Sequence, residues 1–399
     1  MFMIIHDIIK AVVADGNMGF CYKTFQKKKK MGSRSFLSGG RVSLYLHLPF
    51  CQTICTYCDF CKIFYHQPWV QPYFHQLQQE FKSLYHGEVL ETIYIGGGTP
   101  NVLSDAELTQ LLEWLDELPK TENCEYTIEC NVELLTESQL NLFHNYGINR
   151  LSIGIQTVQS RFLHFLGRHH TKEEVQQKVR LAKQYPFSIN LDLMYAFPTE
   201  TIDEVTADLE FFLSLNVDHI STYSLMIEPH TTLFLRHVKP VDEDLDDAMY
   251  QRICSMLKQK YQHYEISNFC KQGKESRHNL TYWQNRPYYG IGVGASGYNQ
   301  NIRYTNTKSF NQYIQGNYLR EEEFIQKKDE MSYEMILGLR LQEGVSIETF
   351  QKKYQTLPWQ VFDLKQQLDR KNLILQDGFL KIPEEKFYIS NEILLEFVD

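Results

Sequence analysis

Six short β-type segments alternate with helical segments between residues 42 and 225, and this alternation restricts the fold more than any other feature of the chain. The segments are rich in Ile, Leu, Val and Tyr and are mostly bounded by Gly, Pro, Asn or Asp. Strands that alternate with helices pair in parallel through right-handed crossovers. The sequence therefore predicts an α/β fold, either a doubly wound sheet or an open (β/α) barrel. The six segments are Val42–Leu48, Thr92–Ile95, Glu125–Glu129, Arg150–Ile155, Ser188–Met194 and His219–Leu225.

Helix signals lie between these segments. An apolar stripe with helical spacing runs from Phe74 to Leu84, and Gly87 stands where a C-cap is expected. Capping boxes predict that four further helices begin at Ser104, Thr136, Thr171 and Thr201, and Gly147 ends the second of these four helices. In both fold types, ligands bind at the carboxyl ends of the strands, so functional residues are expected directly after each strand.

The pattern changes after about residue 235. Residues 264–310 are rich in Tyr, Asn and Gly, and residues 321–399 predict three helices followed by a hairpin around Asp377 and Gly378. Helices followed by a hairpin could form a winged helix. That part of the chain, however, holds ten Lys/Arg against sixteen Asp/Glu, whereas a DNA-binding wing needs a basic face.

The composition is that of a globular protein. The 399 residues carry a net charge of −9, which disfavours nucleic acid as a partner. No apolar run approaches the ~20 residues of a membrane span, so the protein is expected not to be transmembrane and to be cytoplasmic. The basic run Lys27–Lys30 follows an apolar stretch, the reverse of the order in a secretory signal. Residues 1–40 are predicted to be an unstructured extension, or to reflect a start site placed too early, with Met31 as the true start.

Four of the nine cysteines fall within residues 51–61, directly after the first predicted strand. Cys51, Cys55 and Cys58 have the spacing Cys-x3-Cys-x2-Cys. Three thiolates on one short loop can hold three irons of a [4Fe–4S] cluster and leave the fourth iron open to a ligand. A Cys3His zinc site, completed by His47 or His66, is the alternative.

Here the chain resembles a family. The cysteine motif after the first strand is similar to that of the radical S-adenosylmethionine (SAM) superfamily. The stretch Tyr45–Cys51, Tyr-Leu-His-Leu-Pro-Phe-Cys, resembles its oxygen-independent coproporphyrinogen oxidase branch, which includes HemN-type enzymes and HemW-type haem chaperones. The resemblance implies a partial (β/α)6 barrel with a smaller α+β C-terminal domain, and a [4Fe–4S] cluster whose open iron binds SAM.

The other strand ends carry the residues that would hold SAM. Gly96–Gly98 and Thr99 follow the second strand, where glycines let the backbone approach a ligand closely. By resemblance, the positions that match SAM contacts are Tyr45, Gly97, Gly98, Thr99, Glu129, Gln156, Arg168 and Asp192. Cys130, Val132 and Ala196 depart from the residues that are more common in the family.

The stretch Gly292–Gly297 matches the dinucleotide fingerprint Gly-x-Gly-x-x-Gly, but the residues after it are polar and Asn-rich and predict no helix. The fingerprint requires strand, turn and helix, so we do not assign a dinucleotide site. The resemblance instead implies a loop that closes near SAM.

Two positions help to distinguish the HemN-type enzymes from the HemW-type chaperones. HemN-type enzymes have a fourth cysteine where this chain has Phe60, and Cys61 comes one residue later. The stretch His278–Trp283 resembles a marker of the chaperone branch, and imidazole is a normal axial ligand of haem iron. The resemblance therefore implies haem contact at His278, Tyr282 and Trp283, although a buried structural histidine is the simpler interpretation of the residue types.

Two functions follow. The first is a haem chaperone that carries haem to acceptor proteins, some of them at the membrane. The second is a coproporphyrinogen III oxidase that takes a porphyrinogen as substrate, so the resemblance leaves open whether the protein is an enzyme. An electron donor is an expected partner in both cases. The expected division is an extension (1–40), a radical-SAM barrel (41–235), a barrel-closing region that contacts haem or substrate (236–320) and a C-terminal domain (321–399).

Overall fold

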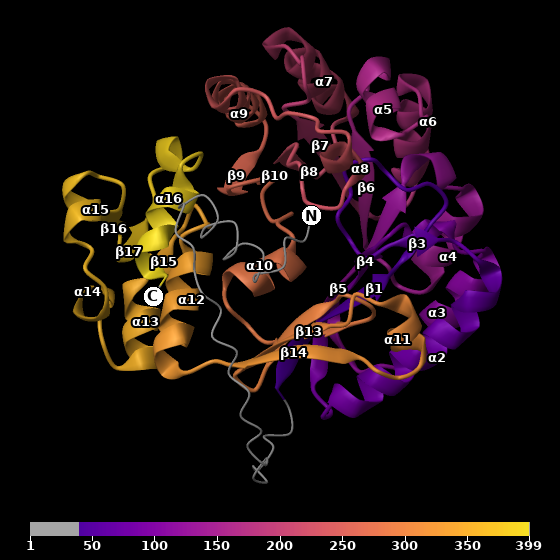
Figure 1. The fold of residues 1–399 in the computed structure, drawn as a ribbon, viewed down its shortest axis with the longest axis horizontal. Coiled ribbons are helices and arrows are strands. Elements are labelled where there is room, and N and C mark those ends of the chain that lie inside the picture. The colour runs from indigo at the N-terminus through magenta and orange to yellow at the C-terminus, as the bar shows by residue number, and fades with distance from the viewer. Residues whose placement is uncertain (1–39, 399) are drawn as a thin grey trace.

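The structure, a computed structural model, describes residues 40–398, so residues 1–39 of the predicted extension, with Met31, lie outside the described part. A sheet of twelve strands, in the order β14-β13-β12-β11-β1-β4-β5-β6-β7-β8-β10-β9, dominates these residues (Figure 1). Seven consecutive strands of this order are parallel: β11 (Tyr288–Ile291) and the six strands of the predicted alternation, which are β1 (Arg41–Leu48), β4 (Val89–Gly97), β5 (Lys120–Asn131), β6 (Arg150–Gln156), β7 (Ser188–Tyr195) and β8 (His219–Ser224).

The six predicted strands are confirmed, and the family's partial barrel is the fold that forms. The largest differences are at β4 and β5, which begin three and five residues earlier than predicted. The added residues of these strands include polar ones such as Glu91 and Glu122. Local composition predicts such strand ends poorly, because pairing with the neighbouring strand determines where a strand begins.

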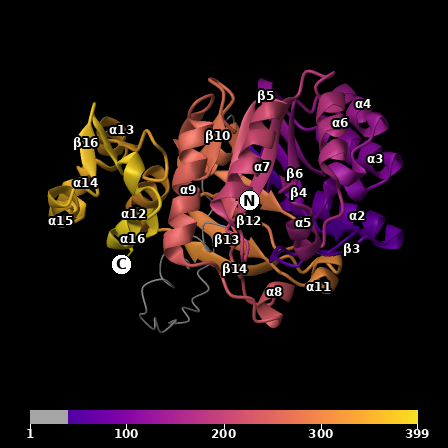
Figure 2. The same cartoon turned by 90° about the horizontal axis from the view of Figure 1, so that it is seen from above.

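Helices connect the parallel strands on the outer side of the sheet (Figures 1 and 2). Three of the predicted capping boxes are complete, at Ser104, Thr171 and Thr201; Thr136 accepts the expected bond from the Gln139 N–H, but the Gln139 amide donates to Asn101 instead. The helices are α2 (Gln67–Leu84), α3 (Asp105–Asp116), α4 (Glu137–Asn145), α5 (Ser160–Leu166), α6 (Lys172–Ala182) and α7 (Ile202–Leu215).

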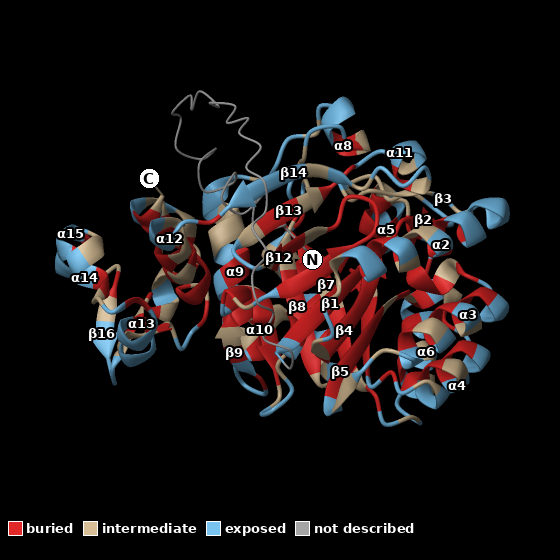
Figure 3. Cartoon of the chain, turned by 90° about the horizontal axis from the view of Figure 1, so that it is seen from below, coloured by how far each residue is buried: buried red, intermediate tan, exposed pale blue. Residues whose placement is uncertain are grey.

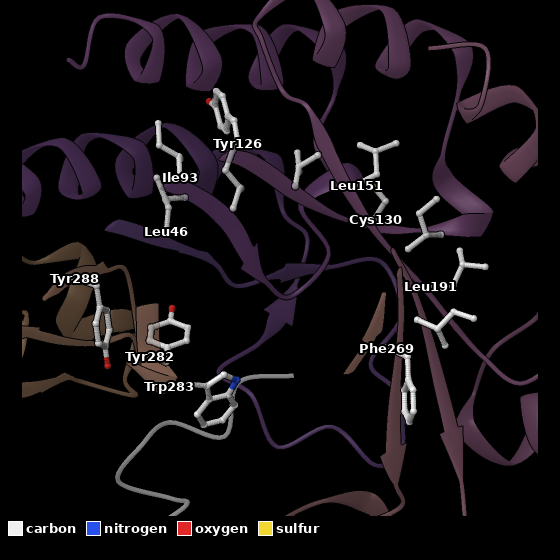
Figure 4. Packing of buried hydrophobic residues seen from close by; sticks show 14 of the residues in the cluster. Leu46, Ile93, Tyr126, Cys130, Leu151, Leu191, Phe269, Tyr282, Trp283 and Tyr288 are labelled. Carbon is white, nitrogen blue, oxygen red and sulfur yellow. The ribbon is translucent and has the colours of Figure 1, made fainter. Parts of the chain in front are cut away.

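The hydrophobic core lies between the sheet and these helices. Figure 3 shows the strands buried and the outer helix surfaces exposed. Figure 4 shows Leu46, Ile93, Leu151 and Leu191 of this core, which come from β1, β4, β6 and β7. A polar residue precedes or follows each of these four residues in its strand. Because successive side chains of a strand point to opposite faces, one face of each strand lies on the core and the other faces the barrel interior.

The sheet continues beyond the six predicted strands on both sides. After β8 come α8 (Thr232–Leu235), α9 (Glu243–Leu257) and the hairpin of β9 (Gln262–Glu265) and β10 (Asn268–Cys270). Helix α10 (Arg277–Trp283) then crosses to the other edge. There β11 (Tyr288–Ile291) pairs in parallel with β1, and β12 (Ser296–Asn299), β13 (Ile302–Asn306) and β14 (Leu319–Phe324) follow as an antiparallel meander, with α11 (Phe310–Ile314) before β14.

The C-terminal part is helical with a small sheet. It contains α12 (Lys327–Gly338), α13 (Ile347–Tyr354), α14 (Pro358–Val361), α15 (Lys365–Asp369) and α16 (Ser390–Leu394), with β15 (Val345–Ser346), β16 (Ile374–Gln376) and β17 (Phe379–Lys381). The predicted hairpin is present, and both Asp377 and Gly378 adopt positive φ at its turn. Four helices rather than the predicted three precede it, because Pro358 splits the chain into short helices. None of the helices within residues 40–398 has the length and apolarity to cross a bilayer.

Candidate functional site

The cysteine loop leaves β1 at the carboxyl edge of the sheet and returns to it. Cys51 lies in the short strand β2 (Phe50–Cys51), which pairs in parallel with β3 (Ile63–Phe64) and so joins the two ends of the loop. In the middle of the loop, the Thr56 N–H donates to the Leu166 carbonyl at 3.1 Å. The loop is therefore fixed at both ends and at its centre, with Cys55 and Cys58 on either side of the central anchor.

Burial favours the protonated form of two of the three cysteine thiols, Cys51 and Cys58. Burial raises the pKa of the Cys51 thiol to about 11 and that of the Cys58 thiol to about 12. The thiolate, not the thiol, binds metal, and the positive charge of bound iron is what lowers such a pKa. The three cysteines therefore fit an iron–sulfur cluster, whose positively charged irons would stabilise the thiolates.

The alternative of a single zinc ion does not fit. Among residues 40–398, no three His, Cys, Asp or Glu side chains lie close enough to hold one metal ion. The His47 ring is already engaged, since its Nδ1 is 3.0 Å from the Tyr45 hydroxyl and its Nε2 is 2.7 Å from the Cys61 carbonyl oxygen. His66 is exposed and contacts Trp69 with its ring. A cube binds each cysteine at a different iron, so the cluster does not require the sulfurs to converge on one point.

The glycine stretch after β4 packs directly beneath the cysteine loop. A Cβ on Gly98 would lie 2.7 Å from the Phe50 carbonyl oxygen and 2.9 Å from the Cys51 sulfur. Gly97 has φ of +115°, a conformation that side chains rarely adopt, and its Cβ would lie 2.7 Å from the His47 ring. The Thr99 hydroxyl approaches the Cys51 sulfur at 3.7 Å. Glycine is thus required here by a close approach of two backbones next to the first cysteine.

Glu129, at the end of β5, lies beside this stretch and is partly buried. Its carboxylate accepts from the Tyr94 hydroxyl at 2.8 Å and from the Gly97 N–H at 3.0 Å. Burial raises its pKa. A carboxylate with two donors still has acceptor capacity on both oxygens, which suits a ligand that presents an amino group.

Arg168 is held rigidly at the end of the next loop. Its guanidinium donates to the Asn131 side-chain oxygen at 3.0 Å, to the Gly154 carbonyl at 2.9 Å and to Glu133 at 3.3 Å. Burial by itself would raise the pKa of Glu133, but the hydrogen bond from His170 and the charge of Arg168 lower it to about 2. The Arg168–Glu133 pair therefore stays charged, and the arginine retains N–H groups for a further anion.

Gln156, at the end of β6, and Asp192, within β7, complete the row. Gln156 is buried with φ of +72°, and its side-chain nitrogen would lie 3.0 Å from a Cβ on Gly154. Asp192 accepts from the Asn190 amide at 2.8 Å, and burial raises the pKa of Asp192. Of the eight positions predicted to contact SAM, five thus lie at the carboxyl end of a strand or directly after it: Gly97, Gly98, Thr99, Glu129 and Gln156. Tyr45 and Asp192 lie three residues before the ends of β1 and β7, and Arg168 follows α5. Their contact with SAM stays a prediction.

The barrel interior below this edge is polar, which the sequence analysis missed. A small cavity there holds about 20 Å³ of solvent-accessible space, room for about one water molecule. The signal in the sequence is a strict alternation in which every second strand residue is polar, as in Ser188, Asn190 and Asp192 of β7. The residues that line the cavity are Tyr94, Thr127, Glu129, Arg150, Ser152, Asn190, Asp192, His219, Ser221, Tyr223, Ser276 and Asn279.

The histidine of the predicted haem-contact stretch lies in the floor of this interior. His278 is completely buried on α10, with its Nδ1 2.6 Å from the Thr92 hydroxyl and its Nε2 2.8 Å from the Tyr282 hydroxyl. Burial lowers the pKa of His278 to about 3. Tyr282 and Trp283 are buried as well (Figure 4). In this arrangement the imidazole joins α10 to β4, and binding to iron would require one of its two hydrogen bonds to break.

The loop Gly292–Gly297 closes over the outer side of the cysteine loop. It is followed by a strand rather than a helix, which confirms that it is not a dinucleotide fingerprint. A Cβ on Gly294 would lie 2.3 Å from the Cys61 sulfur, and one on Gly292 would lie 2.6 Å from the His47 carbonyl oxygen. Cys61 therefore packs against this loop.

Comparison with known proteins places this geometry in a family. The sequence pattern of the Radical SAM superfamily matches residues 45–212, and that of the HemN C-terminal domain matches residues 325–390. Heme chaperone HemW of Lactococcus lactis is 37% identical over 89% of this chain and 97% of that protein. Heme chaperone HemW of Bacillus subtilis is 36% identical over 78% of this chain and 86% of that protein.

A solved structure has the same fold. Coproporphyrinogen III oxidase (HemN) from Escherichia coli superposes with a TM-score of 0.80 at 22% sequence identity, covering 90% of both chains.

Proposed function

Because this chain belongs to the radical SAM superfamily, in the family of the HemW proteins, we propose that it is a haem chaperone, which binds haem and passes it to acceptor proteins. The observation that carries the proposal is the match to 97% of the length of Heme chaperone HemW from Lactococcus lactis. Phe60 supports it, because the oxidase branch has a cysteine at that position.

The cysteine loop is the proposed place of a [4Fe–4S] cluster, held by Cys51, Cys55 and Cys58. When bound, the cluster with SAM would supply reductive cleavage of SAM to methionine and a 5′-deoxyadenosyl radical. The surrounding residues support the cysteine loop. Gly97 and Gly98 let the backbone lie close to the loop, and Thr99 contacts the first cysteine.

The polar groups at the strand ends are the proposed SAM contacts. Glu129 would accept from the amino group, and Arg168 would pair with the carboxylate, since each retains hydrogen-bonding capacity toward the edge of the sheet. Tyr45, Gln156 and Asp192 would hold the remaining polar atoms. Buried groups that already have partners lose little conformational entropy when a ligand binds.

The proposed partners follow from the same family. Haem is the cargo of a cytoplasmic protein, and an electron donor serves its cluster. Acceptor proteins, some of them at the membrane, receive the haem. Haem contact at His278, Tyr282 and Trp283 stays a prediction, and it would cost the imidazole a hydrogen bond to Thr92 or to Tyr282.

Anaerobic reconstitution of the cluster with two assays on one sample tests the function. We expect stoichiometric haem binding, followed by absorbance in the Soret region, and transfer of that haem to an apo-acceptor. Conversion of coproporphyrinogen III to protoporphyrinogen IX with consumption of SAM would overturn the proposal in favour of the oxidase.

The His278→Ala variant tests the haem contact separately. Loss of haem binding in a variant that keeps its cluster and its circular dichroism would support direct contact. Retained haem binding would leave His278 as a residue of the barrel floor.

A further inference from the structure

The segment 226–239, which we call the α8 rim, follows β8 and leans on the cysteine loop. The Leu233 N–H donates to the Thr56 carbonyl at 3.1 Å, and the Leu233 side chain lies in a separate small apolar cluster. Tyr57, between the second and third cysteines, packs against the same cluster. The α8 rim is thus attached to the cysteine loop through its inner face, and Figures 2 and 3 show α8 projecting from the body of the barrel.

The outer face of the α8 rim is apolar and uncovered. Met226 is 49% exposed, Phe234 47% and Leu235 68%, although the neighbouring Leu233 is fully buried. Three large apolar side chains exposed within ten residues indicate a surface that a ligand or partner covers, because scattered single exposures are common but clustered ones are not.

The basic side chains of the α8 rim form no hydrogen bond or ion pair within residues 40–398. His230 and His237 are exposed, and neither imidazole hydrogen bonds to any residue in 40–398; both residues have positive φ, at 70° and 54°. Arg236 and Lys239 are exposed too, and neither forms an ion pair with the described residues. The only acid in the segment is Glu228.

We propose that the α8 rim is the haem-docking surface, with His230 and His237 as iron ligands. This inference rests on the proposed function and locates its cargo. Haem has a flat apolar face, an iron that takes imidazole and two carboxylates, and the α8 rim offers a complement to each: apolar side chains, accessible imidazoles and two free cations. A purely apolar protein segment would leave the imidazoles and cations unmatched.

The contrast with His278 supports this location. The His278 imidazole is buried and both of its nitrogens are engaged, whereas the rim imidazoles are open to solvent. Ligation at the rim would therefore break no existing hydrogen bond. It would also place the cargo beside Tyr57 and the cysteine loop.

The test uses the full-length protein with its cluster reconstituted and haemin as the probe. We expect His230→Ala/His237→Ala to lose the Soret signature of histidine ligation and to bind haemin at least about tenfold more weakly. His75→Ala, an exposed histidine on α2, is the matched control and should bind as the parent does. Unchanged haemin affinity and spectrum in the double variant would overturn the inference.

Protoporphyrin IX separates ligation from apolar contact, since it has the ring and the carboxylates but no iron. Phe234→Ser/Leu235→Ser should weaken binding of both haemin and protoporphyrin IX, whereas the double histidine variant should weaken only haemin. Iron–sulfur absorbance and circular dichroism report on folding in every variant. If the parent itself binds no haemin, the proposed function fails; if the parent binds and the rim variants bind equally well, only this location fails.

Discussion

The barrel interior and the α8 rim reverse the usual distribution of residue types. Inside the barrel, polar side chains such as Asn190, His219 and His278 are buried and held by hydrogen bonds. On the α8 rim, Phe234 and Leu235 are exposed and unpartnered. A buried polar group costs free energy unless it is hydrogen-bonded, and an exposed apolar cluster marks a surface that a ligand or partner can cover.

The difference teaches how the two surfaces can recognise different ligands. The interior groups are fixed in advance by their own partners, so they suit a small polar ligand in one orientation. The rim groups are fixed only through Leu233 and its neighbours, so their outer faces remain available to a large flat ligand. The cysteine loop lies between the two and touches both.

The largest expected effect is at the cysteine loop. Cys55→Ser should abolish iron–sulfur absorbance, because a cluster held by three thiolates loses one of its ligands. Cys61→Ser is the matched control and should keep the cluster. The measurement is iron and sulfide content after anaerobic reconstitution, and unchanged content in Cys55→Ser would contradict the assignment.

The next effect sharpens the contrast between the two kinds of histidine. His278→Ala should lower the free energy of unfolding by about 3 kcal/mol, since it leaves Thr92 and Tyr282 without their buried partner. His237→Ala, at an exposed position, should change it by less than about 0.5 kcal/mol. Denaturant unfolding checks both, and equal effects would break the distinction.

A pH effect of intermediate size should come from the interior. Burial lowers the pKa of His47 to about 4 and that of His278 to about 3, so the unfolded chain binds more protons than the folded one below pH 6.5. Stability from these neutral histidines is complete above pH 6.5 and falls by roughly 1 kcal/mol per pH unit for each histidine as the pH drops toward 4.

The His278→Asn variant isolates one of these two contributions. Its unfolding free energy, measured by denaturant titration at pH 7, 6 and 5, should have a smaller slope with pH than that of the parent. A slope identical to the parent's would show that His278 is not buried in the neutral form.

The smallest expected effect is on the stability of the α8 rim. Phe234→Ser/Leu235→Ser should shift the free energy of unfolding by no more than about 0.5 kcal/mol per residue, because these side chains already lie in solvent. Leu233→Ser is the matched buried control and should cost several times more. Thermal unfolding of the three proteins gives the comparison, and a large loss in the exposed variant would mean that the rim is a structural contact.

Much of the fold was predictable from local signals. The alternation of strands and helices, three complete capping boxes and the turn at Asp377 and Gly378 depend on residues that are close in sequence. Strand ends were less predictable, since β5 begins at Lys120, which pairs with Leu90 of β4, five residues before the predicted start.

The candidate site likewise has features that the sequence predicts and features that only the structure reveals. The spacing of the cysteines and their position after β1 were readable in the sequence. The pairing of Arg168 with Glu133, the engagement of His47 by the Cys61 carbonyl and the burial of His278 were not, because each joins residues that are far apart in the chain or on opposite sides of a loop.

The sequence by itself determined the class of fold, the three cysteines of one loop and the family, because spacing along the chain carries that information directly. Only the tertiary structure decided which histidines are buried and which are open. Imidazoles have the same chemistry wherever they stand in the sequence, and it is their distance from partners such as Thr92 that separates a histidine of the barrel floor from one that can bind a ligand.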